Sequence, residues 1–563
     1  MGSCNPKVSR AKLASLRYNP ARRGITMAES DQTKPAEAAG AKPTGMTRRS
    51  FVTTAAAAGA GVVIVPRHVL GRGMQAPSDT VNVAIVGIGG MGGSNARALM
   101  SQNIVAICDV DDAYANKKLE EYKTTLARLT SGAGSGGSGQ GNQTPPKLTQ
   151  AQVTANQRRP ATNGTADLQR FVEQQLPKVQ RYKDYRQMLE KQKDLDGIVV
   201  ATPDHMHAII ASSAMDIGKH VYVQKPLCWS VQEARHLAQK AKTTKVVSQM
   251  GNQGHSRDEA RLGYEYITSG AIGEVKEVHV WTNRPLGYWP QGVPRPAPLP
   301  SDQAVPWNGK GVEARLAAAL GAGYQVPKEL DWDLFLGVAP KVDYHPIYHP
   351  FNWRGWTDWG QGALGDMGAH LIDHPFWSLD LGFPTVIETI STPFNGACYP
   401  NATTTYYDFP ARGNKPAVKL TWYDGGLLPP RPDEMGEEKM NPTGGVLYIG
   451  SKGKMLQDTY GLNPRLLPKS LHDSTPRPAN KLPRIAHEEH EMNWVEAIKG
   501  KAEISSPFEY AARLTEVMLL GIASLRAGGK IHYDAANMTI TTPAAASQFL
   551  SRQYPQGWTL STL

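Results

Sequence analysis

One stretch constrains this chain more than any other: a short apolar run that ends in a glycine-rich turn. Residues 81–93 read Val-Asn-Val-Ala-Ile-Val-Gly-Ile-Gly-Gly-Met-Gly-Gly, and a helical run, residues 94–100, follows. In such a turn Gly87 allows the tight bend, Gly89 lets a pyrophosphate approach the backbone, and Gly92 lets the helix close on the strand. Phosphates would then lie on the free N–H groups at the helix N-terminus. The stretch predicts a dinucleotide-binding unit.

An acidic residue supports this interpretation. A second strand, residues 104–108, ends at Asp109, 22 residues after Gly87. This is close to the spacing at which a carboxylate binds the adenosine ribose in such folds. Asp111 and Asp112 follow, and a 2′-phosphate placed there would meet repulsion without a compensating arginine. The sequence therefore predicts NAD rather than NADP as the cofactor.

The pattern of elements changes along the chain. In the first part, buried strands at 197–201, 220–223 and 245–249 alternate with helices at 182–192, 208–217 and 230–241. This alternation predicts a parallel sheet that helices cover on both faces. In the later part, strands are expected at 275–282, 386–391, 403–409, 417–423 and 446–450. Because few helices separate them, they predict a mostly antiparallel sheet, and a long helix at 507–526 can return to brace the first domain.

These patterns divide the 563 residues into four parts. We expect a leader (1–76), a Rossmann domain (77–272), a C-terminal α+β domain for substrate binding and oligomerisation (273–535) and a tail (536–563). The Rossmann domain contains an insertion at about 131–165 that is rich in Gly, Ser, Gln and Asn. It has little to bury, so we predict that it is disordered.

The leader resembles a twin-arginine export signal. Arg48 and Arg49 precede Ser-Phe-Val and a weakly apolar run, residues 53–65, which is shorter than the roughly 20 residues that a membrane-spanning helix needs. We therefore expect the twin-arginine machinery to export the protein to the periplasm or beyond, with cleavage after Ala76 and no stable membrane anchor. The alternative is an accidental arginine pair before a disordered tail.

Export would restrict the chemistry. The twin-arginine route carries folded proteins, and nicotinamide cofactors are not expected to be freely available outside the cytoplasm. An exported dinucleotide enzyme would be loaded first and would keep its cofactor. It would also need to return that cofactor to its starting redox state within the site.

The net charge of +11 does not indicate a nucleic-acid-binding protein. Residues 1–76 carry 12 Lys and Arg against 3 Asp and Glu, which leaves 49 against 47 in the rest of the chain. A nearly neutral body lacks the basic surface that nucleic-acid binding requires, so we expect no such partner. The four cysteines lie far apart and form neither a disulfide framework nor a metal knuckle.

Two segments carry candidate catalytic groups. Lys225 follows the strand 220–223, at the sheet edge where ligands bind in such folds, although a surface lysine would look the same. Within residues 365–374, a helix would place Asp366, His370, Asp373 and His374 on one face. From spacing alone, this group could be a metal site, an acid–base pair or a solvated polar face.

Taken together, these stretches resemble the Gfo/Idh/MocA oxidoreductases, the family of glucose–fructose oxidoreductase and inositol dehydrogenase. The resemblance covers about residues 80–535 outside the insertion, and residues 330–337 and 353–356 are similar to an exported, sugar-associated branch. It is carried by the glycine turn, Tyr185–Leu189, Ala201-Thr-Pro-Asp-His205, Lys225-Pro226, residues 269–275 and Asp366-x3-His370. The family implies a Rossmann domain and a C-terminal α/β domain whose open sheet often supports homo-oligomers.

The resemblance also implies roles for three residues. His370 would remove a hydroxyl proton from the substrate, Asp366 would orient that imidazole, and Lys225 would polarise the substrate oxygen. One departure is visible: the family usually has Glu where this chain has Gln224. We therefore expect Lys225 to lack a carboxylate partner.

Further contacts are expected around these residues. The cofactor would be bound by Gly87, Gly89, Gly90, Met91, Gly92, Asp109, Thr202, Pro203, His207 and Lys225. Ring-rich stretches at 344–349 and 353–359 are expected near the cleft, where aromatic faces can stack on a sugar. Candidate substrate contacts are Asn252, His255, Tyr288, Arg354 and His374. No metal ligand is assigned.

The sequence thus favours an exported, NAD-dependent oxidoreductase that acts on a carbinol of a sugar, polyol or glycoside. The main alternative is a glycoside hydrolase or lyase of the same fold, which oxidises its substrate transiently and eliminates the glycosidic bond. A sugar-sensing module with a vestigial site is a third interpretation, which rests on Gln224 alone. In a fourth, Asp366, His370 and His374 are metal ligands.

Overall fold

The computed structural model describes residues 79–131, 164–299, 305 and 308–561. All of them belong to one compact unit, Gly73–Leu563. The predicted export signal, its cleavage site and nearly all of the low-complexity insertion lie outside the described residues. In the described part of the chain, no helix has the length and apolar character that a bilayer crossing requires.

The first sheet has six parallel strands in the order β3-β2-β1-β4-β5-β6. The chain first adds β2 and β3 on one side of β1 and then crosses to add β4, β5 and β6 on its other side. This is the arrangement of a doubly wound Rossmann sheet, and it creates a ligand crevice where the strand order reverses. This confirms the predicted fold of the first domain. The strands are β1 (Asn82–Val86), β2 (Asn103–Cys108), β3 (Gln180–Tyr182), β4 (Gly197–Val200), β5 (His220–Val223) and β6 (Ser248–Met250).

Several helices around this sheet begin at residues whose side chains cap the helix N-terminus. Asp111 accepts a hydrogen bond from the Tyr114 amide before α4, and Ser230 and Glu233 form a capping box before α9. The helix α8 begins at Asp204, four residues earlier than predicted, directly after the extended residue Pro203. The helices of this part are α3 (Met91–Ala98), α4 (Asp112–Thr130), α6 (Thr165–Arg170), α7 (Tyr185–Lys191), α8 (Asp204–Asp216), α9 (Val231–Thr244) and α10 (Asp258–Thr268).

The second sheet has nine strands in the order β13-β12-β11-β7-β10-β9-β8-β14-β15. Within the described part of this second sheet, β7 and β10 are the only strands that pair in parallel. This confirms the mostly antiparallel prediction. The β14–β15 pair crosses the expected domain boundary at residue 535, where Asp534 holds the turn through the amides of Ala536 and Asn537. The strands are β7 (Val275–Thr282), β8 (Val386–Ser391), β9 (Thr403–Phe409), β10 (Val418–Tyr423), β11 (Gly444–Gly450), β12 (Lys454–Asp458), β13 (Arg465–Leu467), β14 (Ile531–Asp534) and β15 (Thr539–Thr542).

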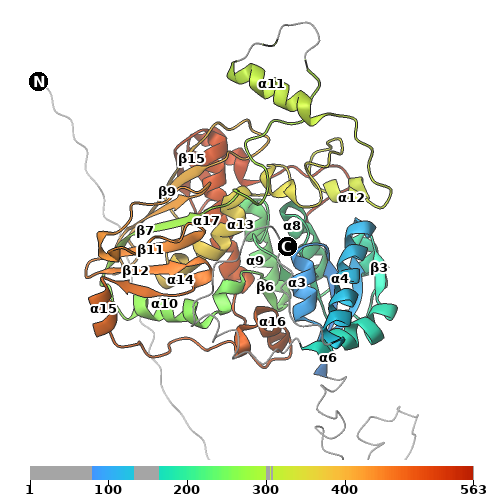
Figure 1. Ribbon diagram of the computed structural model, residues 1–563, viewed down its shortest axis with the longest axis horizontal. Helices are drawn as coiled ribbons and strands as arrows, with labels where there is room; N and C mark the ends of the chain where they lie inside the picture. The colour runs from blue at the N-terminus through green and yellow to red at the C-terminus, as the bar shows by residue number, and fades with distance from the viewer. Residues whose placement is uncertain (1–78, 132–163, 300–304, 306–307, 562–563) are drawn as a thin grey trace, which may run out of the picture. The chain divides into compact units, whose positions relative to one another are not determined.

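The later helices connect the two sheets (Figure 1). The long helix α17 packs against α9 of the Rossmann part, against β8 and against α13, which confirms its predicted bracing role. The shorter α16 packs against α3 and β5. The helices of this part are α11 (Gly309–Leu320), α12 (Trp332–Leu336), α13 (Gly362–Leu371), α14 (Asp373–Ser378), α15 (Lys469–Ser474), α16 (His490–Ile498) and α17 (Phe508–Ala527).

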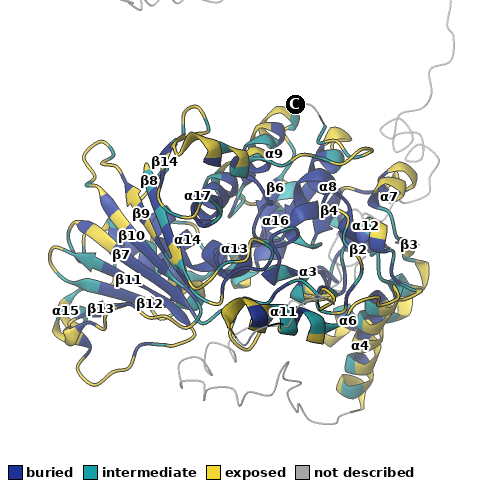
Figure 2. Cartoon of the chain, turned by 90° about the horizontal axis from the view of Figure 1, so that it is seen from above, coloured by how far each residue is buried: buried dark blue, intermediate teal, exposed yellow. Residues whose placement is uncertain are grey.

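Burial differs between the two sheets (Figure 2). Residues of β4 and of α8 are almost all buried, as expected for a sheet that helices cover. In β9, by contrast, buried Tyr407 and Phe409 alternate with exposed Tyr406 and Asp408. The second sheet therefore packs one face on the core, which includes α17. The opposite face is exposed at β8 and β9, whereas at β7, β11 and β12 it is covered by a smaller buried cluster that includes Trp281, Met435 and Leu447.

Candidate active site

A large cleft opens at the carboxyl ends of the strands of the first sheet. Residues that follow β1, β2, β4 and β5 border it on the Rossmann side, and α12, α13 and residues 349–354 border it on the other side. The cleft therefore lies where doubly wound sheets bind their ligands.

The glycine turn forms one wall of this cleft, and steric contacts explain its residues. Gly87 has a positive φ of +84°, and a Cβ there would lie 2.7 Å from the Ala201 carbonyl oxygen. A Cβ on Gly92 would lie 1.9 Å from the Gly87 oxygen, so α3 closes on β1 as predicted. The space beside Gly89 is filled by the Tyr114 ring. No side chain caps α3, so its first N–H groups can bind an anion.

Asp109 supports the turn from the end of β2. Its carboxylate accepts hydrogen bonds from the amides of Ile88 (2.8 Å), Gly89 (3.4 Å) and Asp111 (3.1 Å). Burial raises the pKa of this carboxyl, although the amide hydrogen bonds oppose that shift. A glycine turn, an uncapped helix end and an acid after β2 together fit a dinucleotide.

Most of the predicted cofactor residues border the cleft. Gly92 does not, because it packs on the backbone of the turn. His207 does not either, because it is buried with its two ring nitrogens 2.8 Å from the carbonyl oxygens of Pro226 and Thr202. The predicted residues that border the cleft are Gly87, Gly89, Gly90, Met91, Asp109, Thr202, Pro203 and Lys225.

An ion pair between Lys225 and Asp366 borders the cleft. The Lys225 Nζ lies 2.5 Å from the Asp366 Oδ1, and the two side chains are only 10% and 13% exposed. The Arg354 Nε is 3.7 Å from the same oxygen. Burial opposes ionisation of Asp366, but the charges of Lys225 and Arg354 outweigh it and hold the pKa of this carboxyl below its ordinary value. Asp366 is therefore an ionised carboxylate beside two basic side chains.

This pair corrects one expectation from the sequence. Lys225 does have a carboxylate partner, but Asp366 on α13 supplies it rather than the preceding residue. The Gln224 side chain instead donates to the Asn95 side chain at 2.9 Å. A partner 141 positions away in the chain leaves no local sequence signal.

His370 lies one turn after Asp366 on α13, is almost fully buried and, unlike Asp366, is not among the residues that border the cleft. Burial, followed by the positive charge of Lys225, lowers the pKa of His370 to about 3, so the imidazole is neutral. Its ring packs edge-on against Tyr460, with centroids 4.8 Å apart. The Nδ1 has no hydrogen-bond partner among the described residues. The expected contact in which Asp366 orients this ring is therefore replaced by the pairing of Asp366 with Lys225.

Asp204, at the start of α8, is a site residue that the sequence analysis missed. It borders the cleft close to the Lys225–Asp366 pair. Burial raises its pKa to about 8, while the positive charges of Arg354 and Lys225 oppose that shift. This carboxyl is therefore protonated at neutral pH. The sequence did contain a signal for this residue: Asp204 directly follows Thr202-Pro203 after β4, at the sheet edge where ligands bind.

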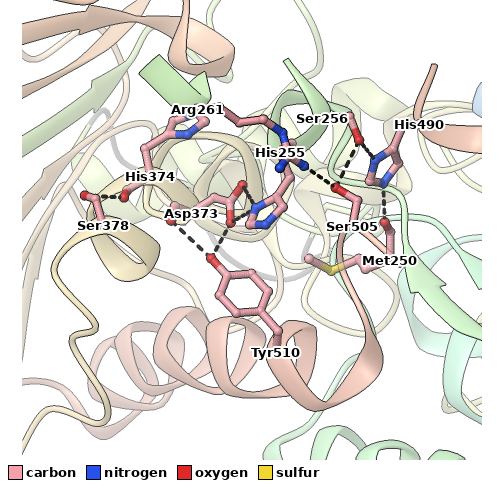
Figure 3. A network of polar contacts seen from close by, with 10 residues as sticks. All are labelled: Met250, His255, Ser256, Arg261, Asp373, His374, Ser378, His490, Ser505 and Tyr510. Carbon is pink, nitrogen blue, oxygen red and sulfur yellow. Dashed lines mark hydrogen bonds and ion pairs between the residues drawn. The ribbon is translucent and has the colours of Figure 1, made fainter. Parts of the chain in front are cut away.

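The predicted polar face of residues 366–374 reaches two different surroundings in the structure. The helix α13 ends at Leu371 and α14 begins at Asp373, but Ile372 between them keeps helical φ and ψ, so Asp366 and Asp373 lie about two turns apart on nearly continuous helical backbone. Asp373 accepts from His255 Nδ1 at 3.0 Å and from the Tyr510 hydroxyl at 2.6 Å (Figure 3). Within the described ranges, no three His, Cys, Asp or Glu side chains are grouped as a metal site requires.

Three candidate substrate contacts lie in this buried region rather than on the cleft. His255 stacks on Trp377 with ring centroids 3.9 Å apart. His374 and Asn252 are buried, and neither borders the cleft. A second histidine, His490, bonds the Ser256 hydroxyl in the same region (Figure 3). Sequence reasoning missed this network because its members come from distant segments.

The aromatic prediction holds for one part of the ring-rich stretch. Phe351, Trp353 and Arg354 border the cleft, and the Arg354 guanidinium lies 4.4 Å and 4.2 Å from the centroids of those two rings. Tyr288, in contrast, is 42% exposed, does not border the cleft and contacts Arg284 instead. Cleft residues without a predicted role include Tyr114, Lys183, Tyr185, Phe335 and Trp558.

Comparison with known families matches two segments of this chain. Residues 133–252 match the Gfo/Idh/MocA model described as "Oxidoreductase family, NAD-binding Rossmann fold". Residues 309–389 match its companion, "Oxidoreductase family, C-terminal alpha/beta domain". The chain carries Gfo/Idh/MocA family oxidoreductase domains. Its first domain is thus an NAD-binding Rossmann domain, and the structure adds the glycine turn, which precedes the matched segment.

Curated relatives resemble part of these Gfo/Idh/MocA domains. A "Glycosyl hydrolase family 109 protein" of Shewanella baltica (strain OS195) is 25% identical over 248 residues, which is 40% of this chain and 44% of the relative. A "Levoglucosan dehydrogenase" of Pseudarthrobacter phenanthrenivorans is 30% identical over 92 residues, 16% of this chain and 23% of the relative. The chain thus spans less than half the length of the relatives it matches.

Solved structures are similar over a larger share of the chain. The WlbA dehydrogenase from Bordetella pertussis, in complex with NADH and UDP-GlcNAcA, has a TM-score of 0.47 at 14% identity and covers 81% of this chain and 99% of its own. A levoglucosan dehydrogenase in complex with NADH and L-sorbose has a TM-score of 0.45 at 15% identity, with coverages of 81% and 99%.

Proposed function

We propose that this protein is an exported, NAD-dependent oxidoreductase that acts on a carbinol of a sugar, polyol or glycoside and retains its cofactor. One observation carries the proposal: the Lys225–Asp366 ion pair borders the same cleft as the glycine turn. A buried lysine that a carboxylate holds in its charged form is suited to stabilising negative charge on a substrate oxygen. The NAD-binding Rossmann fold of the first domain supports the same reaction class.

Lys225, Asp366 and His370 have different roles in removing the proton of the substrate hydroxyl. Lys225, fixed by Asp366, donates a hydrogen bond to the substrate hydroxyl oxygen and lowers the pKa of that hydroxyl. His370, one turn from Asp366 on α13, accepts the hydroxyl proton, although it is not itself among the residues that border the cleft. Because burial makes its imidazole a weak base, with a pKa of about 3, polarisation by Lys225 is required for this transfer. NAD, when bound, supplies the two-electron acceptor for the substrate carbon.

A second function is favoured by a specific observation. Several relatives are named as glycosyl hydrolase family 109 proteins, and Asp204 borders the cleft as a protonated acid. In this alternative, the substrate carbon is oxidised only transiently, which acidifies the neighbouring C–H bond and allows the glycosidic bond to be eliminated. Asp204 would then give its proton to the leaving oxygen.

Export and self-association belong to the same proposal. Export through the twin-arginine machinery is supported by Arg48, Arg49 and the apolar run after them, and it gives a reason for retaining the cofactor. A homo-oligomer is supported by the exposed face of the second sheet at β8 and β9, where Ile390 is 57% and Tyr406 43% exposed. Fractionation of the native host and light scattering of the purified protein test these two points.

The deciding experiment begins with mass spectrometry of the purified protein for a co-purified dinucleotide. Absorbance at the reduced-nicotinamide band is then followed while sugars, polyols and aryl glycosides are added. A lasting rise with a sugar or polyol supports the dehydrogenase. Release of the aryl group without lasting absorbance supports the hydrolase or lyase. A protein that neither holds nor binds a dinucleotide contradicts both.

A further inference from the structure

The last described segment of the chain crosses back to the Rossmann part. We call Ser551–Ser561 the closing segment; it contains neither helix nor strand. The Arg552 guanidinium donates to the carbonyl oxygens of His205 (3.3 Å) and Asp358 (3.4 Å) and lies 4.1 Å from the Trp229 ring centroid. The start of the closing segment is therefore bound beside the N-terminus of α8.

Side chains on α8 and α9 hold the rest of the closing segment. The Tyr554 hydroxyl donates to Glu233 on α9 at 2.6 Å. The Ser561 hydroxyl bonds Ser212 on α8 at 2.8 Å and also accepts from Lys240 on α9. Residues between these contacts, Pro555–Gly557, are exposed. Tyr554, Trp558 and Leu560 also pack, partly buried, against the main core. A peripheral segment without helix or strand hydrogen bonds opens more readily than that core.

Between these fastenings, Trp558 reaches the cleft. Its indole borders the cavity, stacks on Tyr185 with centroids 6.5 Å apart, and lies under the Arg186 guanidinium at 4.6 Å. Tyr185 follows β3, whereas Lys225 follows β5, and these strands lie on opposite sides of β1. Trp558 therefore borders the end of the cleft that is remote from the ion pair, on the side where Asp109 follows β2.

We propose that the closing segment is a strap that retains the cofactor, with Trp558 as a binding residue for the adenosine half of NAD. The inference rests on the proposed use of NAD. An aromatic face stacks on a purine, and Tyr185 and Arg186 hold the indole in one orientation. Release then requires the segment to lift from α8 and α9, as lid opening limits product release in other enzymes. Such a strap suits an enzyme that regenerates its cofactor in place.

The test compares dissociation rates of NADH from the full chain. Protein loaded with NADH is mixed with excess NAD, and the loss of nicotinamide fluorescence is followed. We expect Trp558→Ala to release NADH about tenfold faster, as lost stacking and burial imply. Trp558→Phe, which keeps an aromatic face, should stay within about threefold of the wild type. Gln556→Ala, an exposed position of the same segment, is the matched control and should not change the rate.

A second variant separates the strap from a local defect at Trp558. Tyr554→Phe removes only the hydrogen bond to Glu233, and we expect release to accelerate by a factor of about 3. Unchanged release from both Trp558→Ala and Tyr554→Phe, with NADH still bound, overturns the strap and leaves the proposed function intact. A wild-type chain that binds no NADH overturns the proposed function and this inference together.

Discussion

Two consecutive helices, α13 and α14, each carry an aspartate close to a histidine, yet only the first borders the cleft. Asp366 is paired with Lys225 at 2.5 Å and stays partly accessible from the cavity. Asp373 is fully buried, and His255 and Tyr510 occupy its carboxylate (Figure 3). Aspartates of similar sequence context thus form an ion pair that borders the cleft in one place and a fully buried hydrogen-bond network in the other.

The physical cause of this difference is position along a nearly continuous stretch of helix. Ile372, between α13 and α14, keeps helical φ and ψ of −68° and −24°, so Asp373 lies about two turns beyond Asp366, roughly 10 Å further along the axis. There its carboxylate meets His255 and Tyr510 instead of the cleft. Access to the cavity, rather than residue type or spacing, therefore distinguishes the two aspartates.

The largest expected effect comes from removing the lysine of the accessible pair. Lys225→Met should lower kcat about 10³-fold, because the substrate oxygen loses its polarising charge. The variant should also lose about 3 kcal/mol of unfolding free energy, since only Arg354, at 3.7 Å, is left to balance the charge of Asp366. Turnover with the identified substrate and urea unfolding measure the two effects.

A double variant separates the catalytic from the structural loss. Lys225→Met combined with Asp366→Asn removes both charges, so most of the lost stability should return while kcat stays low. Activity that returned together with stability would mean that the pair only supports the fold.

The buried network should respond in the opposite way. Asp373→Asn removes the negative charge and one of the two acceptor oxygens and sets an amide donor against His255 or Tyr510, and we expect a loss of about 3 kcal/mol of unfolding free energy. In folded protein, kcat and KM should change less than about twofold, because none of these groups borders the cleft. Urea unfolding beside steady-state kinetics checks both statements, and a collapse of kcat without destabilisation would contradict the assignment.

The pH dependence of stability adds a second measurement for Asp373. Burial opposes its ionisation, but His255 and Tyr510 outweigh it and hold its pKa below the ordinary value. Its contribution to stability is therefore present above the unfolded pKa of about 4 and is lost as pH falls through the lower folded value. Asp373→Asn should flatten this acid limb of the stability profile.

Sequence patterns predicted what depends on neighbours in the chain. The strand before Gly87, the glycine contacts and the position of Lys225 after β5 all follow from local periodicity and backbone sterics. The two sheets could likewise be predicted, although β3 and β12 to β15 were missed because each spans only three to five residues.

What sequence patterns could not predict depends on distant contacts. Lys225 finds its carboxylate on α13, and Trp558 reaches the cleft from the far end of the chain. The raised pKa of Asp204 arises from burial, which spacing does not encode. Even so, the family resemblance located Asp366 correctly at the cleft, and only its partner was wrong.

Asp109 adds a third aspartate to the comparison between Asp366 and Asp373. Its partly buried carboxylate is held by backbone amides and not by a side-chain cation. Asp109→Asn replaces one acceptor oxygen with a donor that faces the amides of Ile88, Gly89 or Asp111, so the glycine turn should loosen. We expect NADH to bind about tenfold more weakly. NADPH should lose less, because a negative charge near the 2′-phosphate is removed. Fluorescence titration of both cofactors checks this, and an unchanged ratio of their Kd values would count against the predicted NAD preference.

The smallest expected effect is that of the titration of Asp204 on activity. This residue combines features of the other two aspartates, since it is buried like Asp373 but borders the cleft like Asp366. Its pKa of about 8 means that activity should fall about threefold between pH 7 and pH 9 as a second negative charge forms beside Asp366. Its contribution to stability is complete below about pH 4 and is lost as pH rises towards the folded pKa. Asp204→Asn, which stays neutral, should retain activity at pH 9 and unfold with the same free energy at pH 5 and pH 8.5. An alkaline decline as steep in this variant as in the wild type would assign the titration to another group and leave Asp204 a structural role alone.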